Sequence, residues 1–115
     1  MEPQHMTFGA VLARLDDGLI WNHSVYLSDP HNLTLETMCL VIDADAAEHG
    51  EDNYTPLIAE QSGLEEFLLV QDIMMVRDYV AGCGVDPNER SLTFATKFYF
   101  ERDAYPGEAE LAQHR

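Results

Sequence analysis

A chain of 115 residues, 46% of them apolar, is long enough to bury one hydrophobic core and too short for two, which predicts a single domain over residues 1–115. Its 21 Asp and Glu residues outnumber its 6 Lys and Arg residues, so the formal net charge is −15. A surface this acidic repels phosphates and anionic lipid headgroups, which argues against direct binding to nucleic acid or to a membrane and favours a basic protein partner.

The first part of the chain predicts a helix followed by two strands. We expect residues 1–6 to be a flexible extension and Thr7 to cap a helix that runs to about Leu15, with apolar residues at helical spacing on one face. A short strand is predicted at Ser24–Leu27 and a second at about Thr37–Asp43. The core of the second strand is continuously apolar, which is typical of a central strand covered on both faces.

The second part predicts one more strand among helices. A short helix is expected over residues 56–61, a third strand over 64–70 and a helix over about 71–81. The last helix is expected over 86–102, and the polar tail over 106–115 is expected to fray. Together these elements predict an α/β or α+β fold, with a sheet of about three strands packed against three to four helices.

Two features of the last helix are informative. Asp86 is predicted as its N-cap, with Pro87 as the first helical residue and Glu89 as the partner in a capping box. The region is also unusually rich in aromatic residues, so we expect at least one exposed ring that can anchor an interface. The aromatic residues concerned are Phe94, Phe98, Tyr99, Phe100 and Tyr105.

An acidic loop separates the second strand from the short helix and carries no basic residue. Like charges at this density oppose compaction, so we expect the loop to be exposed. We predict that its carboxylates steer a cationic partner and that a flanking tyrosine anchors it. The predicted partner-binding residues are Asp43, Asp45, Glu48, Glu51, Asp52 and Tyr54.

No motif in the chain predicts an enzyme, a metal site or a cofactor. Asp43 and Asp45 match the first two ligands of a calcium loop, but Ala47, Glu48 and Tyr54 stand where a ligand, a glycine and a bidentate Glu are needed. All the histidines fall in predicted loops or tails and are expected at the surface. These residues are His5, His23, His31, His49 and His114.

The two cysteines give no catalytic signal either. Cys39 lies inside the apolar strand, where burial raises a thiol pKa and makes the group inert. No stretch approaches about 18 consecutive apolar residues, and the first residues lack a basic region followed by an apolar run. We therefore expect a cytoplasmic protein in which Cys39 and Cys83 are reduced thiols.

The run from Leu33 to Asp45 resembles a strand-then-acid signature in a family of small acidic bacterial proteins of uncharacterised function. The likeness continues through the acidic loop to Asp52, the Gly63–Leu64 step into a strand and the helix end at Tyr99–Tyr105, so that it spans roughly residues 8–105. The group is similar to immunity proteins of bacterial toxin systems, including contact-dependent growth inhibition. The resemblance implies an inhibitor and assigns no catalytic residue.

The leading functional hypothesis is an acidic binding protein that neutralises a cationic partner, as a toxin-immunity protein that inhibits a cognate nuclease-type toxin. A nuclease carries a basic groove to hold nucleic acid, and an acidic inhibitor can fill that groove. Three alternatives stay open: a phage- or plasmid-encoded DNA mimic that inhibits a defence nuclease, a small ligand-binding or enzymatic domain whose site the fold assembles, and an accessory domain of an oligomer whose acidic residues serve solubility alone.

Overall fold

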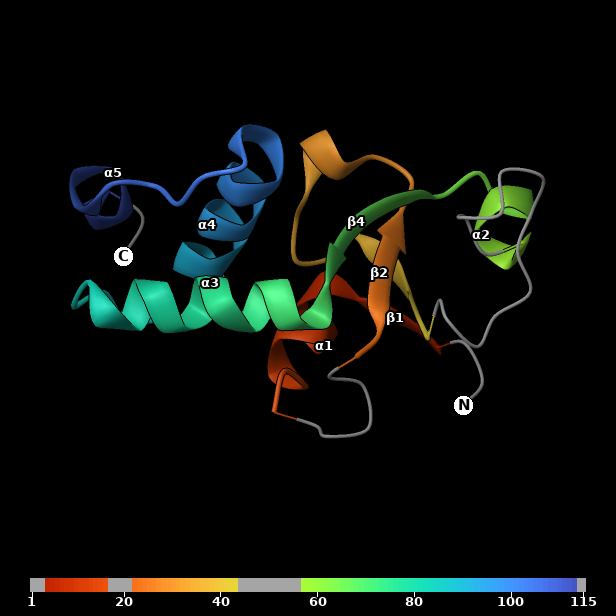
Figure 1. Ribbon diagram of the computed structural model, residues 1–115, viewed down its shortest axis with the longest axis horizontal. Coiled ribbons are helices and arrows are strands. Elements are labelled where there is room, and N and C mark those ends of the chain that lie inside the picture. The colour runs from red at the N-terminus through yellow and green to blue at the C-terminus, as the bar shows by residue number, and fades with distance from the viewer. Residues whose placement is uncertain (1–3, 17–21, 44–56, 114–115) are drawn as a thin grey trace.

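The computed structural model describes residues 4–16, 22–43 and 57–113, which form an α+β fold around a four-stranded antiparallel sheet (Figure 1). This confirms the predicted fold class, with one strand more than expected. The strands lie in the order β1-β3-β2-β4 and span Gln4–Thr7 (β1), Ser24–Leu27 (β2), Met38–Ile42 (β3) and Glu65–Leu69 (β4). The helices span Phe8–Ala13 (α1), Leu57–Gln61 (α2), Val70–Gly82 (α3), Glu89–Arg102 (α4) and Glu108–Ala112 (α5), and a 3-10 turn spans Pro30–Asn32 (η1).

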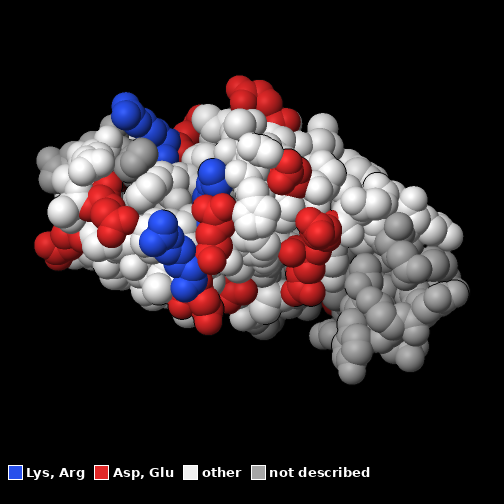
Figure 2. Space-filling view, turned by 90° about the horizontal axis from the view of Figure 1, so that it is seen from above, with Lys and Arg blue, Asp and Glu red and all other residues white. Residues whose placement is uncertain are grey.

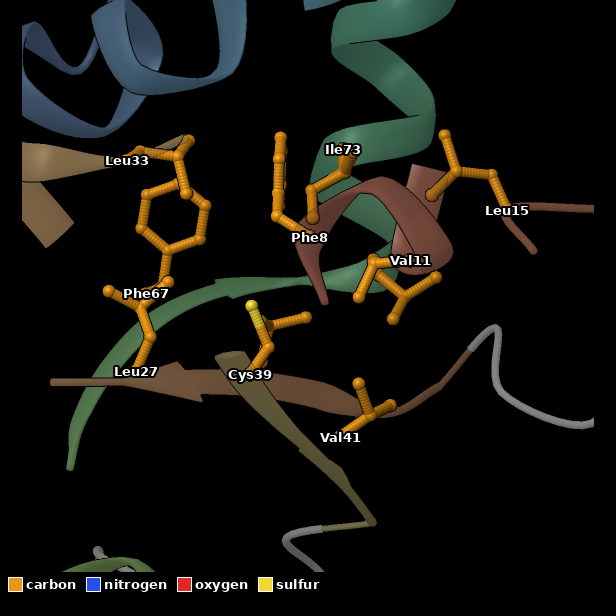
Figure 3. Packing of buried hydrophobic residues seen from close by; sticks show 11 residues of the cluster. Phe8, Val11, Leu15, Leu27, Leu33, Cys39, Val41, Phe67 and Ile73 are labelled. Atoms are coloured by element: carbon orange, nitrogen blue, oxygen red, sulfur yellow. The ribbon is translucent and has the colours of Figure 1, made fainter. Parts of the chain in front are cut away.

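Strand β3 is central, and its residues 39–42 are buried on both faces, as its continuous apolar run predicts, whereas Met38 at its start is exposed. Cys39 and Val41 point into a cluster with α1 and α3, where the rings of Phe8 and Phe67 meet edge to face at 6.2 Å (Figure 3). The alternate β3 residues, Leu40 and Ile42, pack on the other side with Tyr26 and with Ala59 of α2. Because successive side chains of a strand point to opposite faces, a strand covered on both sides must be apolar throughout.

Strand β1 contains residues 4–6, which belong to the segment expected to be a flexible extension; residues 1–3 lie outside the described residues. Residues 4–7 pair with β3, with Gln4 opposite Val41 and Thr7 opposite Met38. The Arg14 guanidinium donates a hydrogen bond of 2.6 Å to the Gln4 side chain and so ties the strand to the end of α1. The segment is short and polar, so its own residues carry no strand signal; its conformation comes from the unpaired edge that β3 offers it.

The helices α3, α4 and α5 form a second packed layer beside the sheet (Figure 1). Their core joins Val76 and Val80 of α3 to Leu92 and Ala95 of α4, and it includes the fully buried Leu111 of α5. The ordered α5 corrects the expectation that residues 106–115 fray, as far as residue 113, where the described part ends. Burial of this apolar side chain helps to dock the short helix.

The start of α4 differs from the sequence-based expectation by two residues. Asn88, and not Asp86, is the N-cap, and its side chain accepts a hydrogen bond of 3.0 Å from the Ser91 amide. The Asp86 carbonyl instead accepts a hydrogen bond of 2.7 Å from the buried Ser91 hydroxyl. A buried hydroxyl needs a partner, and this contact keeps residues 86–88 outside the helix.

Candidate partner-binding surface

The predicted acidic site is described only at its first residue. Asp43 follows β3 directly and is half-buried. The other predicted partner-binding residues lie outside the described residues, so their role stays a prediction: Asp45, Glu48, Glu51, Asp52 and Tyr54.

His23 is buried, which corrects the expectation that it lies at the surface. Its side chain is 3% exposed, and Nδ1 lies 2.9 Å from the Asn22 side-chain oxygen. Burial lowers the pKa of His23, and the nearby carboxylate of Asp43 opposes that shift. The position follows from the sheet, because Ser24 pairs with Ile42 and the His23 carbonyl accepts a hydrogen bond from the Val70 amide at 2.9 Å.

The cysteine chemistry agrees with the sequence. Cys39 is buried, and burial raises the pKa of its thiol to about 12, so the reactive thiolate is not populated near neutral pH.

In the described part of the chain, no three His, Cys, Asp or Glu side chains gather in an arrangement suited to hold a metal ion. None of the described helices is long and apolar enough to cross a bilayer.

Three half-buried tyrosines from different segments lie ring to ring. Tyr79 of α3 stacks on Tyr105 with ring centroids 4.4 Å apart and planes 12° apart, and Tyr99 of α4 lies 5.2 Å from Tyr105. The Tyr79 hydroxyl donates a hydrogen bond of 2.7 Å to the Pro106 carbonyl, which holds the connection between α4 and α5 against α3. Packing of this kind fixes the rings, so little side-chain entropy is left to lose on binding.

Four carboxylates lie close enough to these rings to affect the pKa values of the tyrosines. The pKa of Tyr99 is raised first by burial and then by its neighbours Asp72, Tyr105 and Asp103. The pKa of Tyr79 is raised first by hydrogen bonding with the Cys83 side chain, then by burial, and further by the charges of two carboxylates in α5. The carboxylates in α5 are Glu108 and Glu110, which, like Asp103, are exposed.

An exposed methionine lies on the same face of α3. Asp72, Met75 and Tyr79 follow one another at spacings of three and four residues, which places them on one side of a helix. Met75 is 51% exposed and is one of three large apolar residues that the described part of the chain exposes, with Met38 and Leu69. We call the set of Met75, Tyr79, Tyr99 and Tyr105 the tyrosine surface, and its acidic rim consists of Asp72, Asp103, Glu108 and Glu110.

The sequence signalled part of this surface. Tyr99 and Tyr105 belong to the dense aromatic set from which an exposed anchor was expected. Tyr79 and Met75 were missed because they lie in another helix, and only the packing of α3 against α4 brings them alongside. The spacing of Asp72, Met75 and Tyr79 was the one local signal available, since it puts a polar, an apolar and an aromatic side chain on a single face.

Other described carboxylates lie next to basic side chains. Figure 2 shows acidic side chains in several separate groups on one face, with basic side chains next to some of them. Arg77 pairs with Asp16 at 2.9 Å and with Asp78 at 3.5 Å. His31 lies 2.8 Å from Glu101, and this hydrogen bond is the first cause that lowers the pKa of Glu101. Some of the described carboxylates thus pair with a nearby basic side chain. These carboxylates are not the ones that form the rim of the tyrosine surface.

Comparison with known proteins identifies a family and no characterised relative. No curated protein and no solved structure matches the chain. A family model matches residues 5–106, which takes in β1 from its second residue, the strands β2 to β4 and the helices α1 to α4. The chain therefore belongs to the family described as "Domain of unknown function (DUF7716)".

Proposed function

We propose that this protein binds and neutralises a basic protein partner, and that it is an immunity protein that inhibits a nuclease-type toxin. The observation that carries the proposal is the tyrosine surface with its acidic rim, in a chain whose formal net charge is −15. The proposal includes no catalytic step by this chain.

The composition of the tyrosine surface matches what makes protein interfaces tight. Binding energy concentrates on a few aromatic side chains at the centre of an interface, and polar residues around them exclude water. Here the rings of Tyr79, Tyr99 and Tyr105 supply the centre, and Met75 adds adaptable apolar area. Because the carboxylates of the rim are negatively charged, the matching partner surface is basic.

A nuclease is the partner class that fits this charge best. Its active groove must attract a phosphate backbone, so it presents clustered Lys and Arg. An acidic protein that covers such a groove competes with the nucleic acid for the same cations, and the opposite charges accelerate the encounter. We propose that the acidic residues following β3, Asp43 among them, add to this steering.

A cytoplasmic location is part of the proposal. Cys39 and Cys83 are both free thiols. Thiols persist in a reducing compartment such as the cytoplasm, where an immunity protein would meet a toxin that has entered the cell.

The proposal is tested by isolating a partner and then measuring inhibition. Proteins that bind the immobilised chain at low salt and elute at high salt are identified, and the purified candidate is assayed for nuclease activity with increasing amounts of this protein. We expect stoichiometric inhibition and an association rate that falls steeply as salt rises. A rate independent of salt would contradict electrostatic steering. Capture of a host defence nuclease would favour the DNA-mimic alternative.

The surface itself is tested with matched variants. Tyr99→Ala and Tyr105→Ala are each expected to weaken the complex by about tenfold or more, because each removes a packed ring from the centre of the interface. Phe98→Ala, a half-buried aromatic on α4 outside the surface, is the control. Likewise, Glu108→Gln with Glu110→Gln should slow association, whereas Glu65→Gln with Glu66→Gln on β4 should not. If the control variants had the same effects as the variants of the tyrosine surface and its rim, the interface would lie elsewhere.

A further inference from the structure

A shallow groove of about 500 Å³ lies between α4 and the segment that follows η1. Residues of the first turns of α4 form one wall, and residues 33–36 form the other. The volume falls within the range of sites that bind small molecules. The lining residues are Leu33, Thr34, Leu35, Glu36, Arg90, Thr93, Phe94 and Lys97.

The walls of the groove are held in place by the fold. Leu33 is buried in the main core, and the Leu35 carbonyl accepts a hydrogen bond of 3.0 Å from the Gly9 amide of α1. The Thr34 amide donates to the Thr37 hydroxyl at 2.9 Å, which closes the turn between them. The opposite wall belongs to a capped helix. A ligand would therefore meet a preformed site with little ordering cost.

The charge of the groove is opposite to that of the chain. Arg90 and Lys97 are two of the six Lys and Arg residues in a chain of net charge −15. They are seven residues apart on α4, which puts them on one face and about 10 Å apart along the axis. Neither forms an ion pair with a described residue, whereas Arg77 is bound to two carboxylates. Lys97 contributes to lowering the pKa of Glu101, one turn further along.

One carboxylate, that of Glu36, also lines the groove and opposes an anion. Among the lining residues, two cations thus stand against one carboxylate. Between the cations lie the ring of Phe94 and the methyl-bearing side chain of Thr93, and the facing wall offers the leucines at positions 33 and 35. The site thus combines an apolar floor with cationic ends.

We propose that this groove binds a small organic anion with an apolar body, whose carboxylate or phosphate group lies against Arg90 and Lys97 and whose body lies against Leu35 and Phe94. An uncharged apolar ligand would leave the two cations without a partner, and a small inorganic anion would leave the apolar floor exposed to water. The proposal is independent of the tyrosine surface, whose residues do not line the groove.

The first test is a nuclear magnetic resonance titration of the full chain with sodium octanoate at constant ionic strength. We expect saturable shifts of the Leu35, Thr93 and Phe94 amides. Acetate, which lacks the apolar body, and octan-1-ol, which lacks the charge, should each bind at least about tenfold more weakly. Shifts that do not saturate, or that appear equally on surfaces outside the groove, would overturn the proposal.

Variants then separate the site from general electrostatics. Arg90→Gln and Lys97→Gln are each expected to weaken octanoate binding by about tenfold, because a charge-assisted contact is lost. Glu36→Gln should strengthen it. The control is Arg102→Gln, which removes a cation from the same helix outside the groove, next to the ring of Phe98. An equal loss with Arg102→Gln would overturn the proposal without bearing on the toxin-binding function.

Discussion

At the residue scale, His23 makes the stability of the protein depend on pH. Because its pKa is lowered in the folded state, the neutral ring stabilises the fold fully above the ordinary value of 6.5, and this contribution is lost as the pH falls through the folded pKa. We expect the free energy of unfolding, measured with urea, to fall relative to that of His23→Asn by up to about 1.4 kcal/mol per pH unit below this value.

The variant serves as the reference, since groups far from His23 have the same surroundings in both proteins. Parallel pH profiles would show that the buried ring does not cause the effect.

The burial of His23 could not be predicted from the sequence. Its neighbours predict a loop, and a loop residue is expected at the surface. Its burial depends on the pairing of β2 with both β3 and β4, which no local pattern reveals. Cys39 was predictable because its burial follows from its own strand.

At the element scale, two variants test whether Asn88 or Asp86 caps the start of α4. Asn88→Ala should lower the free energy of unfolding by about 1 kcal/mol, because the Ser91 amide at the helix start loses its acceptor. Asp86→Ala retains the backbone carbonyl that Ser91 uses and should cost much less. Urea unfolding of the two variants measures this difference. A larger loss at Asp86 would place the cap where the sequence pattern predicts it.

The strongly patterned elements were predictable, and the others were not. β2 was expected at Ser24–Leu27 and occupies those residues, and β3 lies within one residue of its expected ends. Their apolar runs specify burial on their own. β1 and α5 were missed because each is short and polar apart from single residues such as Leu111. β1 depends on pairing with the edge of β3, and α5 depends on packing against α3 and α4. Both contacts are formed by distant parts of the folded chain, so no local pattern predicts them.

At the scale of the whole molecule, the excess of acid opposes the compact state. Most carboxylates have no nearby cation to offset them, since only 6 Lys and Arg face 21 Asp and Glu. Raising NaCl from about 0.01 M to about 0.15 M shortens the screening length from about 30 Å to about 8 Å. We expect the free energy of unfolding in urea to rise by on the order of 1 kcal/mol over this range.

Glu65→Lys combined with Glu66→Lys, two exposed positions on β4, should reduce this salt dependence by lowering the net negative charge. A free energy of unfolding that falls as salt rises would instead mean that attractive pairs such as Arg77 with Asp16 dominate.

The net charge could be predicted from the sequence, but the position of the carboxylates beside the aromatic rings could not. That surface joins α3, α4 and the segment before α5, and it exists only because those helices pack together.

Strand β1 has a practical consequence for anyone who handles this protein. It forms one outer edge of the sheet, so an extended tag fused in front of Gln4 would prolong a row of backbone groups that is open to pairing with a neighbouring molecule. A version trimmed to start at Met6 would leave the backbone of Leu40 and Val41 without the partners Gln4 and His5 provide. Purification handles are better placed after α5, where the chain leaves a helix.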